Sequence, residues 1–369
     1  MFRRLCFPVF LLLGFPAFLA ATTLDTGEID GARFTIARPA HWNHCLLLLA
    51  HGYRPESAPL VADLDPGQEV CRTLLDAGWM VATTSYRRNG LILTDAITDL
   101  DALHAYIAKT YEPPARVLLE GEDMGGTIVT LMAEYDDSPY SGAIAIGTTF
   151  DVRESNERIG LTLQPKIPLI FLATQTELSG PRRYVNTRVP HDKADPHPVI
   201  FFVARDGHAN VNQRERLAAL RALVIWLERG PGTLPHPAAG EEFFNATLPP
   251  TPQPSQVAFA PDGHSFDARV TEISAFTGNL TINAQPDDFA RLGLGKSSRF
   301  QLAAHGLTFR VRRGRDFDSV KRGEWVALPN ADGFFWLARN HASAADTAQV
   351  AVGDTVTIRS FDEPPAPEN

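Results

Sequence analysis

The amino-acid sequence predicts an N-terminal α/β domain, with a mostly parallel sheet and helices on both faces, followed by a small all-β barrel. Three observations lead to this fold class. Apolar runs of strand length alternate with helix-like segments between residues 22 and 230. A proline-rich segment without periodicity, typical of a linker, covers residues 231–255. Short alternating segments bounded by Gly, Asn and Asp fill residues 256–360, and a tail of residues 361–369 follows.

Six apolar runs are typical of strands that are buried on both faces of a parallel sheet. They cover residues 44–53, 79–86, 115–121, 142–147, 167–174 and 198–204. Helix-like patterns lie between or after these runs, at residues 69–78, 96–111, 127–135 and 212–230. Because strand and helix alternate along the chain, we expect crossover connections and a parallel sheet.

The N-terminal residues have the composition of a secretory signal peptide. The stretch MFRRLCFPVFLLLGFPAFLAATT carries two arginines, then an apolar run and then small residues. It predicts cleavage near residue 21, a secreted or periplasmic protein, and no membrane association after cleavage; a retained membrane anchor is the alternative. Cleavage would remove Cys6 and leave Cys45 and Cys71, whose spacing alone does not decide between a disulfide and two free thiols.

The overall charge excludes one class of partner. With a net charge of -9, the chain lacks the basic face that a nucleic-acid backbone requires. No Cys/His spacing suggests a metal site, and no nucleotide-binding loop or redox cofactor motif is present, so we expect no cofactor. A small-molecule substrate is the expected partner, and the oligomeric state stays open.

Residues 121–126, GEDMGG, lie between an apolar strand pattern and a helix pattern. A strand, a sharp turn with glycines two places either side of one residue, and then a helix make up the G-x-S-x-G nucleophile elbow. Here the central residue is Asp123 instead of serine, and no other G-x-S-x-G occurs in the chain. Asp123 is therefore the candidate nucleophile.

The partners that such a nucleophile needs follow at the ends of later strands. Glu177, in QTELSGP, is the candidate acid, and His208, in ARDGHAN, is the candidate base. The backbone N–H groups of Tyr53, in AHGYRP, and of Met124 are the candidate oxyanion hole. Two further residues, Tyr86 and Arg87, are expected to contact substrate or to cover the end of the sheet.

The His-Gly turn, the elbow and the later Gly-His occur in the chain order of the α/β-hydrolase superfamily, which residues 30–230 resemble. The resemblance implies a hydrolase acting on an ester-type or related small-molecule bond. Esterase-like members carry serine where this chain has Asp123, and that departure leaves three hypotheses open. Asp123 is a working nucleophile, or a degenerate remnant in a binding protein, or a base that positions water.

The first hypothesis resembles epoxide hydrolases and haloalkane dehalogenases, which use aspartate at the elbow to form an alkyl-enzyme ester. Those families usually place Trp after the aspartate, and epoxide hydrolases need tyrosines in a cap. Here Met124 follows instead, and residues 150–166 contain no tyrosine.

The second domain resembles the C-terminal β-barrel of S-adenosylmethionine hydroxide adenosyltransferases. Positions that match that family's pattern are Gly278, Asn279, Asn283, Gly323, Glu324, Gly333, Asn340, Ser343, Ala344, Ala345, Gly353 and Asp354. Asp332 stands where the family often has serine, and the family's N-terminal domain, which supplies much of the nucleoside site, is absent, so we interpret the barrel as an adapted accessory domain. S-adenosylmethionine binding and a carbohydrate- or substrate-docking face around Trp325 and Trp336 are the alternatives.

Overall fold

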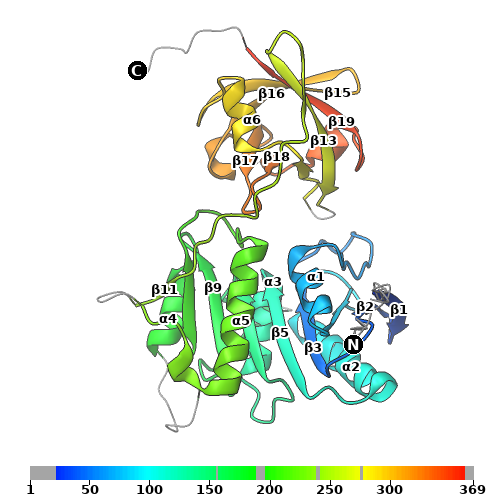
Figure 1. Cartoon of the computed structure of the whole chain (residues 1–369), viewed down its shortest axis with the longest axis vertical. Helices are drawn as coiled ribbons and strands as arrows, with labels where there is room; N and C mark the ends of the chain where they lie inside the picture. The colour runs from blue at the N-terminus through cyan, green and yellow to red at the C-terminus, as the bar shows by residue number, and fades with distance from the viewer. Residues whose placement is uncertain (1–21, 155–156, 188–195, 238–241, 275–276, 362–369) are drawn as a thin grey trace, which may run out of the picture.

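The structure, a computed structural model, describes residues 22–154, 157–187, 196–237, 242–274 and 277–361. The predicted signal peptide and residues 362–369 of the predicted tail lie outside this range. Figure 1 shows two domains, one above the other, connected by the segment that follows α5. Across the described residues, no helix is both long enough and apolar enough to span a bilayer.

The N-terminal domain is built on a nine-stranded sheet. Its strands lie in the order β1 (Thr23–Ile29), β2 (Ala32–Arg38), β4 (Met80–Thr84), β3 (Cys45–Ala50), β5 (Arg116–Glu122), β6 (Gly142–Ile146), β9 (Leu169–Thr174), β10 (Val199–Val203) and β11 (Phe244–Asn245). Strand β2 pairs antiparallel with both β1 and β4, and all other pairs are parallel. This confirms the mostly parallel sheet.

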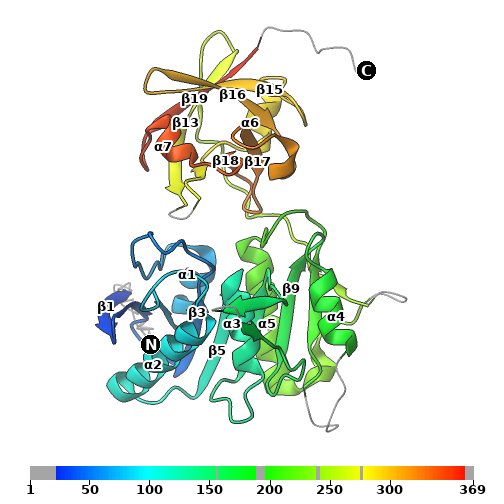
Figure 2. The ribbon, with the colours of Figure 1, turned by 180° about the vertical axis from the view of Figure 1, so that it is seen from behind.

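Helices cover both faces of this sheet (Figures 1 and 2). One face carries α1 (Glu69–Asp76) and α5 (Gln213–Arg229). The other face carries α2 (Leu93–Tyr111), α3 (Met124–Ala133) and α4 (Ser179–Thr187). A short hairpin of β7 (Val152–Glu154) and β8 (Glu157–Ile159) lies between β6 and β9 in sequence.

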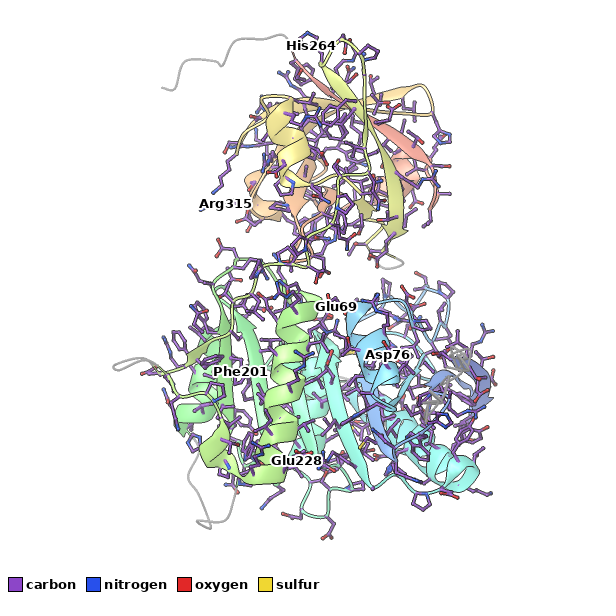
Figure 3. All side chains as sticks on the ribbon, in the orientation of Figure 1. Glu69, Asp76, Phe201, Glu228, His264 and Arg315 are labelled. Carbon is purple, nitrogen blue, oxygen red and sulfur yellow. The ribbon has the colours of Figure 1, made fainter. Side chains whose placement is uncertain are left out.

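The apolar runs form strands because both of their faces are buried. In β3, Leu46 and Leu48 join the core under α2 and α3, whereas Leu47 joins the core under α1 and α5. All three are 0% exposed, and burying each stabilises the fold by about 1.5–3 kcal/mol. Figure 3 shows side chains filling the interior of each domain, with Phe201 of β10 in the second of these cores.

Two strands of the sheet differ from the sequence prediction. The hairpin of β1 and β2 was not predicted, because β1 is an exposed edge strand that lacks an apolar run. Strand β11 lies within the predicted linker of residues 231–255 and pairs with β10 at the opposite edge. The predicted linker thus contains a short strand, which the sequence does not reveal because two residues are too few to produce a periodic pattern.

The C-terminal domain is a closed barrel, as predicted. Its strands are β12 (Ala258–Phe259), β13 (Ser265–Ile273), β14 (Leu280–Ile282), β15 (Arg299–Ala304), β16 (Leu307–Arg313), β17 (Trp325–Pro329), β18 (Phe335–Arg339) and β19 (Thr355–Ser360), and its helices are α6 (Pro286–Arg291) and α7 (Ala344–Ala348). Pairing of β13 with β19 closes the ring. Phe266, Phe289, Phe300 and Phe335 fill the barrel. Trp325 is buried, so it does not form an open docking face.

Candidate active site

Asp123 occupies the turn between β5 and α3, where the sequence places the elbow. Its backbone has φ 57° and ψ -120°, a positive-φ conformation that costs a non-glycine residue about 1–3 kcal/mol and is typical of functional turns. The Asp123 N–H donates to the Ile146 carbonyl over 2.9 Å. The turn is therefore held from β6 while its side chain projects beyond the carboxyl ends of the strands.

The glycines of the elbow are required because a side chain at these positions would overlap neighbouring atoms. A Cβ on Gly121 would lie 2.0 Å from the Gly125 carbonyl oxygen, and one on Gly125 would lie 2.0 Å from the Ala50 carbonyl oxygen. On the neighbouring turn, a Cβ on Gly52 would lie 2.7 Å from Asp123 Oδ2. Helix α3 can therefore approach β3 and β5 only because these positions lack side chains.

We expect Gly125→Ala to destabilise the N-terminal domain by about 3 kcal/mol or more, because its Cβ would overlap main-chain atoms that cannot rotate away. Urea unfolding of the full chain measures this. Gly160→Ala is the matched control, since a Cβ there meets nothing within 4 Å. Equal midpoints for the two variants would contradict the packing argument.

His208 is carried by the loop between β10 and α5. Gly207 and Ala209 on either side of it both have positive φ. Arg205 braces the loop, because its guanidinium pairs with Glu215 in the first turn of α5 and also donates to the Asn210 carbonyl. The loop brings His208 Nε2 to 2.9 Å from Asp123 Oδ1.

Glu177 lies on the other side of the imidazole. Its Oε1 accepts from His208 Nδ1 and from the Ala209 N–H. Its Oε2 lies 2.9 Å from the hydroxyl oxygen of Thr174, at the end of β9. The structure thus brings together the three candidate residues, with His208 between Asp123, the candidate nucleophile, and Glu177, the candidate acid.

The two amides expected to form an oxyanion hole both contact the Asp123 carboxylate. The Tyr53 N–H donates to Oδ2 over 2.8 Å, and the Met124 N–H also hydrogen-bonds the carboxylate. One carboxylate oxygen therefore lies at an oxyanion-hole amide, while the other faces the imidazole.

These contacts make Asp123 and His208 an ion pair. Burial alone would raise the pKa of Asp123, but hydrogen bonds from His208 and from the Tyr53 and Met124 amides outweigh it and lower that pKa. Hydrogen bonds to Asp123 and then to Glu177 raise the pKa of His208 to about 10. At neutral pH, the carboxylate is therefore ionised and the imidazole is protonated.

This ion pair predicts a pH dependence of stability. Because the folded-state pKa of His208 is raised, its contribution to the free energy of unfolding is complete below pH about 6.5 and is lost as the pH rises through about 10. The imidazole is 56% exposed, so solvent screening limits the contribution to about 1 kcal/mol. We expect the difference in Tm between wild type and His208→Gln to narrow from pH 6 to pH 10.5. A difference independent of pH would contradict the assignment.

Tyr86 and Arg87, which were expected to contact substrate or to cover the end of the sheet, both make contacts within the protein. Tyr86 is 0% exposed, stacks on His51, and its hydroxyl donates a hydrogen bond to the His51 carbonyl, which corresponds to the second alternative. Arg87 is held by the buried Asp99 through its side chain and its N–H. Tyr53, by contrast, is an exposed aromatic residue beside Asp123.

A buried ion pair that was not predicted from the sequence lies below the elbow. Glu120 of β5 is 1% exposed and pairs with Arg216 of α5. Arg216 also lies 3.8 Å from Glu122. The signal was a glutamate inside an otherwise apolar run, since a buried acid requires a cationic partner.

Cys45 and Cys71 are both free thiols. In the described ranges, no three His, Cys, Asp or Glu side chains converge closely enough to hold a metal ion.

Comparisons with known proteins bear on each domain separately. Residues 276–357 match the family model of the SAM hydroxide adenosyltransferase C-terminal domain. A search of curated proteins finds no match to the chain.

Solved structures provide more distant matches. An uncharacterized conserved protein from Thermotoga maritima is 20% identical, with 36% of this chain and 48% of that chain covered and a TM-score of 0.26. The Pyrococcus furiosus esterase Pf2001 is 13% identical over 56% of this chain and 90% of its own, with a TM-score of 0.42. Porphyromonas gingivalis dipeptidyl peptidase 4 is 12% identical over 56% and 35%, also with a TM-score of 0.42. The chain thus spans about half of the Thermotoga protein and about a third of the peptidase.

The strand order, the elbow and the order of the three site residues assign the fold of the first domain. The strands follow the order β1-β2-β4-β3-β5-β6-β9-β10, and β2 is antiparallel to its neighbours. The elbow follows β5. The chain therefore consists of a first domain with the α/β-hydrolase fold and a closed β-barrel that is similar to the C-terminal domain of SAM hydroxide adenosyltransferases.

Proposed function

We propose that this protein is a hydrolase that cleaves a small-molecule bond at a saturated carbon through a covalent ester on Asp123. The observation that carries the proposal is that the two oxygens of the Asp123 carboxylate have different partners. Asp123 Oδ2 accepts from the Tyr53 amide and Oδ1 faces His208. Oδ1 is therefore an ionised oxygen beside His208. Oδ2 is held at the amide where negative charge would develop during hydrolysis of an ester on Asp123.

The first step uses the ionised carboxylate as nucleophile. An Asp123 oxygen attacks the alkyl carbon, a carbon–oxygen bond forms, and the leaving group departs with the electron pair of its bond to carbon. Attack on an acyl carbonyl is disfavoured instead, because it would exchange an ester for a more reactive anhydride. Alkyl halides and alkyl esters of strong acids are the substrate classes that fit, because their leaving groups depart as stable anions without a proton donor.

The second step follows from the change of charge. Esterification removes the negative charge of Asp123, whose hydrogen bond does most to raise the pKa of His208. The imidazolium then releases its proton to solvent and becomes a base. Neutral His208 takes a proton from water, the hydroxide adds to the ester carbonyl, and the Tyr53 and Met124 amides bind the oxyanion. Collapse releases the alcohol, which takes the proton from His208. The Asp123 carboxyl group that is left then gives its proton to the imidazole, which restores the ion pair.

Isotope labelling tests this route. Single-turnover conversion in H₂¹⁸O should place the label in the Asp123 carboxylate, because water attacks the ester carbonyl and not the alkyl carbon. Peptide mass spectrometry locates the label, with 1-bromobutane as the first probe. Label found only in the product alcohol would indicate direct attack by water, with Asp123 as a base.

A second candidate is a catalytically disabled hydrolase that serves as a binding protein. One observation favours it: the carboxylate already engages the amides that an acyl substrate would need. The two candidates differ in whether the wild-type chain turns over any alkylating probe.

Export is a separate proposal. It is supported by the arginines and apolar run within residues 1–21. Mass analysis of mature protein recovered from the host's periplasm or medium tests it, and an N-terminus at Met1 on a membrane-bound chain would favour the anchor instead.

A further inference from the structure

The connecting segment, residues 242–257, leads into the barrel and is hydrogen-bonded to the loop between β10 and α5. Beside β10, the Ala246 N–H donates to the Phe202 carbonyl over 2.7 Å. At the start of the loop, the Ala204 N–H donates to the Thr247 hydroxyl over 2.7 Å. The connecting segment therefore follows β10 and then the loop, instead of crossing freely from one domain to the other.

The main chain of Leu248 is held at both of its polar groups by buried side chains at the start of α5. Its N–H donates to Glu215 Oε1 over 3.0 Å, and its carbonyl accepts from the side-chain amide of Asn212 over 2.8 Å. Asn212 and Glu215 are both 0% exposed. They also cap the helix, because each accepts from the backbone N–H of the other. The connecting segment is therefore fixed to the cap of α5.

Glu215 joins this contact to the loop that carries His208. Its two oxygens accept from the two terminal nitrogens of Arg205, over 2.9 and 3.0 Å, and Arg205 also donates to the Asn210 carbonyl within the loop. One buried carboxylate thus accepts from the loop, from the helix cap and from the connecting segment. The loss of any of these donors would leave a buried polar group unpaired, so the three parts hold one another in place.

The barrel contacts the same end of α5 through Asp332, in the turn between β17 and β18. Asp332 Oδ1 accepts from the N–H of Gln213, the first residue of α5, over 3.2 Å. A Cβ on Gly333 would lie 3.1 Å from Pro250, so this turn packs against the connecting segment. Arg205 acts electrostatically on Asp332. The barrel is therefore seated beside the groups that hold the loop.

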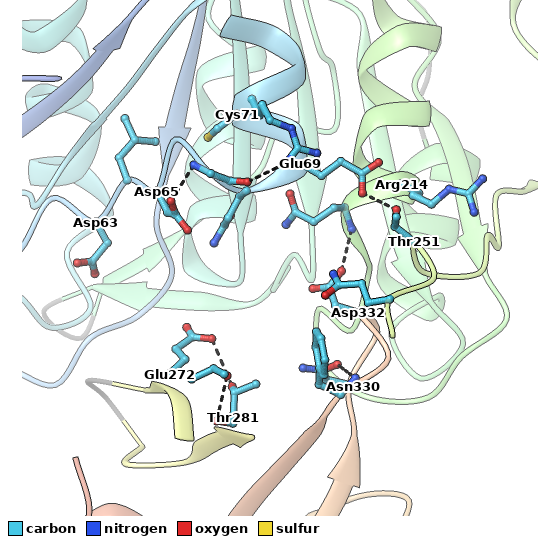
Figure 4. Close-up of a pocket in the computed structure, with 18 of the residues that line it drawn as sticks. Asp63, Asp65, Glu69, Cys71, Arg214, Thr251, Glu272, Thr281, Asn330 and Asp332 are labelled. Carbon is cyan, nitrogen blue, oxygen red and sulfur yellow. Dashed lines mark hydrogen bonds between the residues drawn. The ribbon is translucent and has the colours of Figure 1, made fainter. Parts of the chain in front are cut away.

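The seat of the barrel extends to α1. Figure 4 shows the Thr251 hydroxyl bonded to Glu69, over 2.6 Å, at the start of that helix. Glu69 of the first domain and Asp332 of the barrel both line a cleft of about 850 Å³ between the domains. The connecting segment and the β17–β18 turn thus hold the barrel against α1 and α5 at one side of this cleft.

We propose that Glu215 is a positioning residue that ties the His208 loop to the connecting segment, and that the seated barrel thereby keeps His208 within reach of Asp123. The tolerance is small. His208 Nε2 lies 2.9 Å from Asp123 Oδ1, so a displacement of the loop by about 1 Å would break that hydrogen bond. This coupling is independent of the reaction, whereas the use of His208 as a base rests on the proposed function.

NMR titration of the imidazole nitrogens in the full chain tests the role of Glu215. In wild type, hydrogen bonds to Asp123 and then to Glu177 raise the pKa of His208 to about 10. Glu215→Gln removes the charge that holds Arg205, so we expect the loop to move away from both carboxylates and the pKa of His208 to fall below about 9.

Glu134→Gln is the matched control for this variant. Glu134 also accepts from several donors, the N–H groups of Thr162 and Leu163 and the Tyr184 hydroxyl, but it lies at the C-terminal end of α3, away from the site. A general loss of stability would be common to both variants, whereas a fall in the pKa of His208 is expected only for Glu215→Gln.

Hydrogen exchange tests the part played by the barrel. Asp332→Ala removes the acceptor at the first N–H of α5, and we expect the amides of residues 204–212 to exchange about threefold faster or more. Asp354→Ala is the matched control. This half-buried aspartate also accepts from a main-chain N–H, but Ala351 and His305, which it contacts, belong to the barrel.

Two results would overturn the proposal. They are a pKa of His208 that is the same in Glu215→Gln as in wild type or falls equally in Glu134→Gln, and loop exchange in Asp332→Ala that equals that of Asp354→Ala. Circular dichroism verifies that each variant is folded. If Glu215→Gln does not fold, the pKa of His208 in Asp332→Ala decides, since that side chain is only half-buried. These measurements need no substrate, so a chain without hydrolase activity would still decide the coupling.

Discussion

His208→Gln is expected to stop turnover after the first chemical step and to accumulate a covalent ester on Asp123. The glutamine removes the base but leaves the Asp123 carboxylate held by the Tyr53 amide, so alkylation continues. Ester hydrolysis then lacks general-base catalysis, which is worth about 10²–10⁴ in rate. With the probe that wild type converts fastest, intact mass should increase by one alkyl group, and peptide mapping should place that group on Asp123.

The control for this experiment is the double variant Asp123→Asn/His208→Gln. It keeps the size of the side chain but removes the nucleophilic oxygen, so the adduct should disappear. An adduct that persists at another residue would show nonspecific alkylation. Complete turnover by His208→Gln at the wild-type rate would refute the role of the histidine.

Asp123→Ser is expected to create ester hydrolysis where wild type has little. Replacing the carboxylate removes the oxygen at the Tyr53 amide and leaves both amides available to an oxyanion. It also removes the hydrogen bond that does most to raise the pKa of His208, so the imidazole becomes a neutral base near neutral pH. Glu177, which accepts a hydrogen bond from Thr174, still orients the ring. Hydrolysis of p-nitrophenyl acetate should rise by about 10²-fold or more over wild type.

Asp123→Ala is the matched control here, because it empties the site without supplying a nucleophile. An alanine variant as active as the serine variant would contradict the assignment of position 123. A serine variant that hydrolyses esters, together with a wild type inert to every alkylating probe, would instead favour the disabled hydrolase.

The site could be located from sequence because its parts follow strand ends. Two local patterns have steric causes: Gly121 and Gly125 around Asp123, and the Gly-His pair at position 208. The carboxyl ends of parallel strands lie at one edge of the sheet, so residues that follow these strands lie close together. Tyr86 could not be placed in the same way. The segment that carries it ends at the same edge, but its ring turns inward onto His51, and inward or outward orientation depends on packing that no local pattern encodes.

The amino-acid sequence by itself determined the two domain classes, the elbow and its chain-ordered partners, because apolar periodicity and glycine spacing act over a few residues. Only the tertiary structure decided that the Asp123 carboxylate engages the Tyr53 amide and forms an ion pair with His208, since these contacts join residues 70 and 85 positions apart. It also decided that acids from both domains face one cleft. Distances between such residues depend on how helices and sheets pack, and packing is a property of the whole chain.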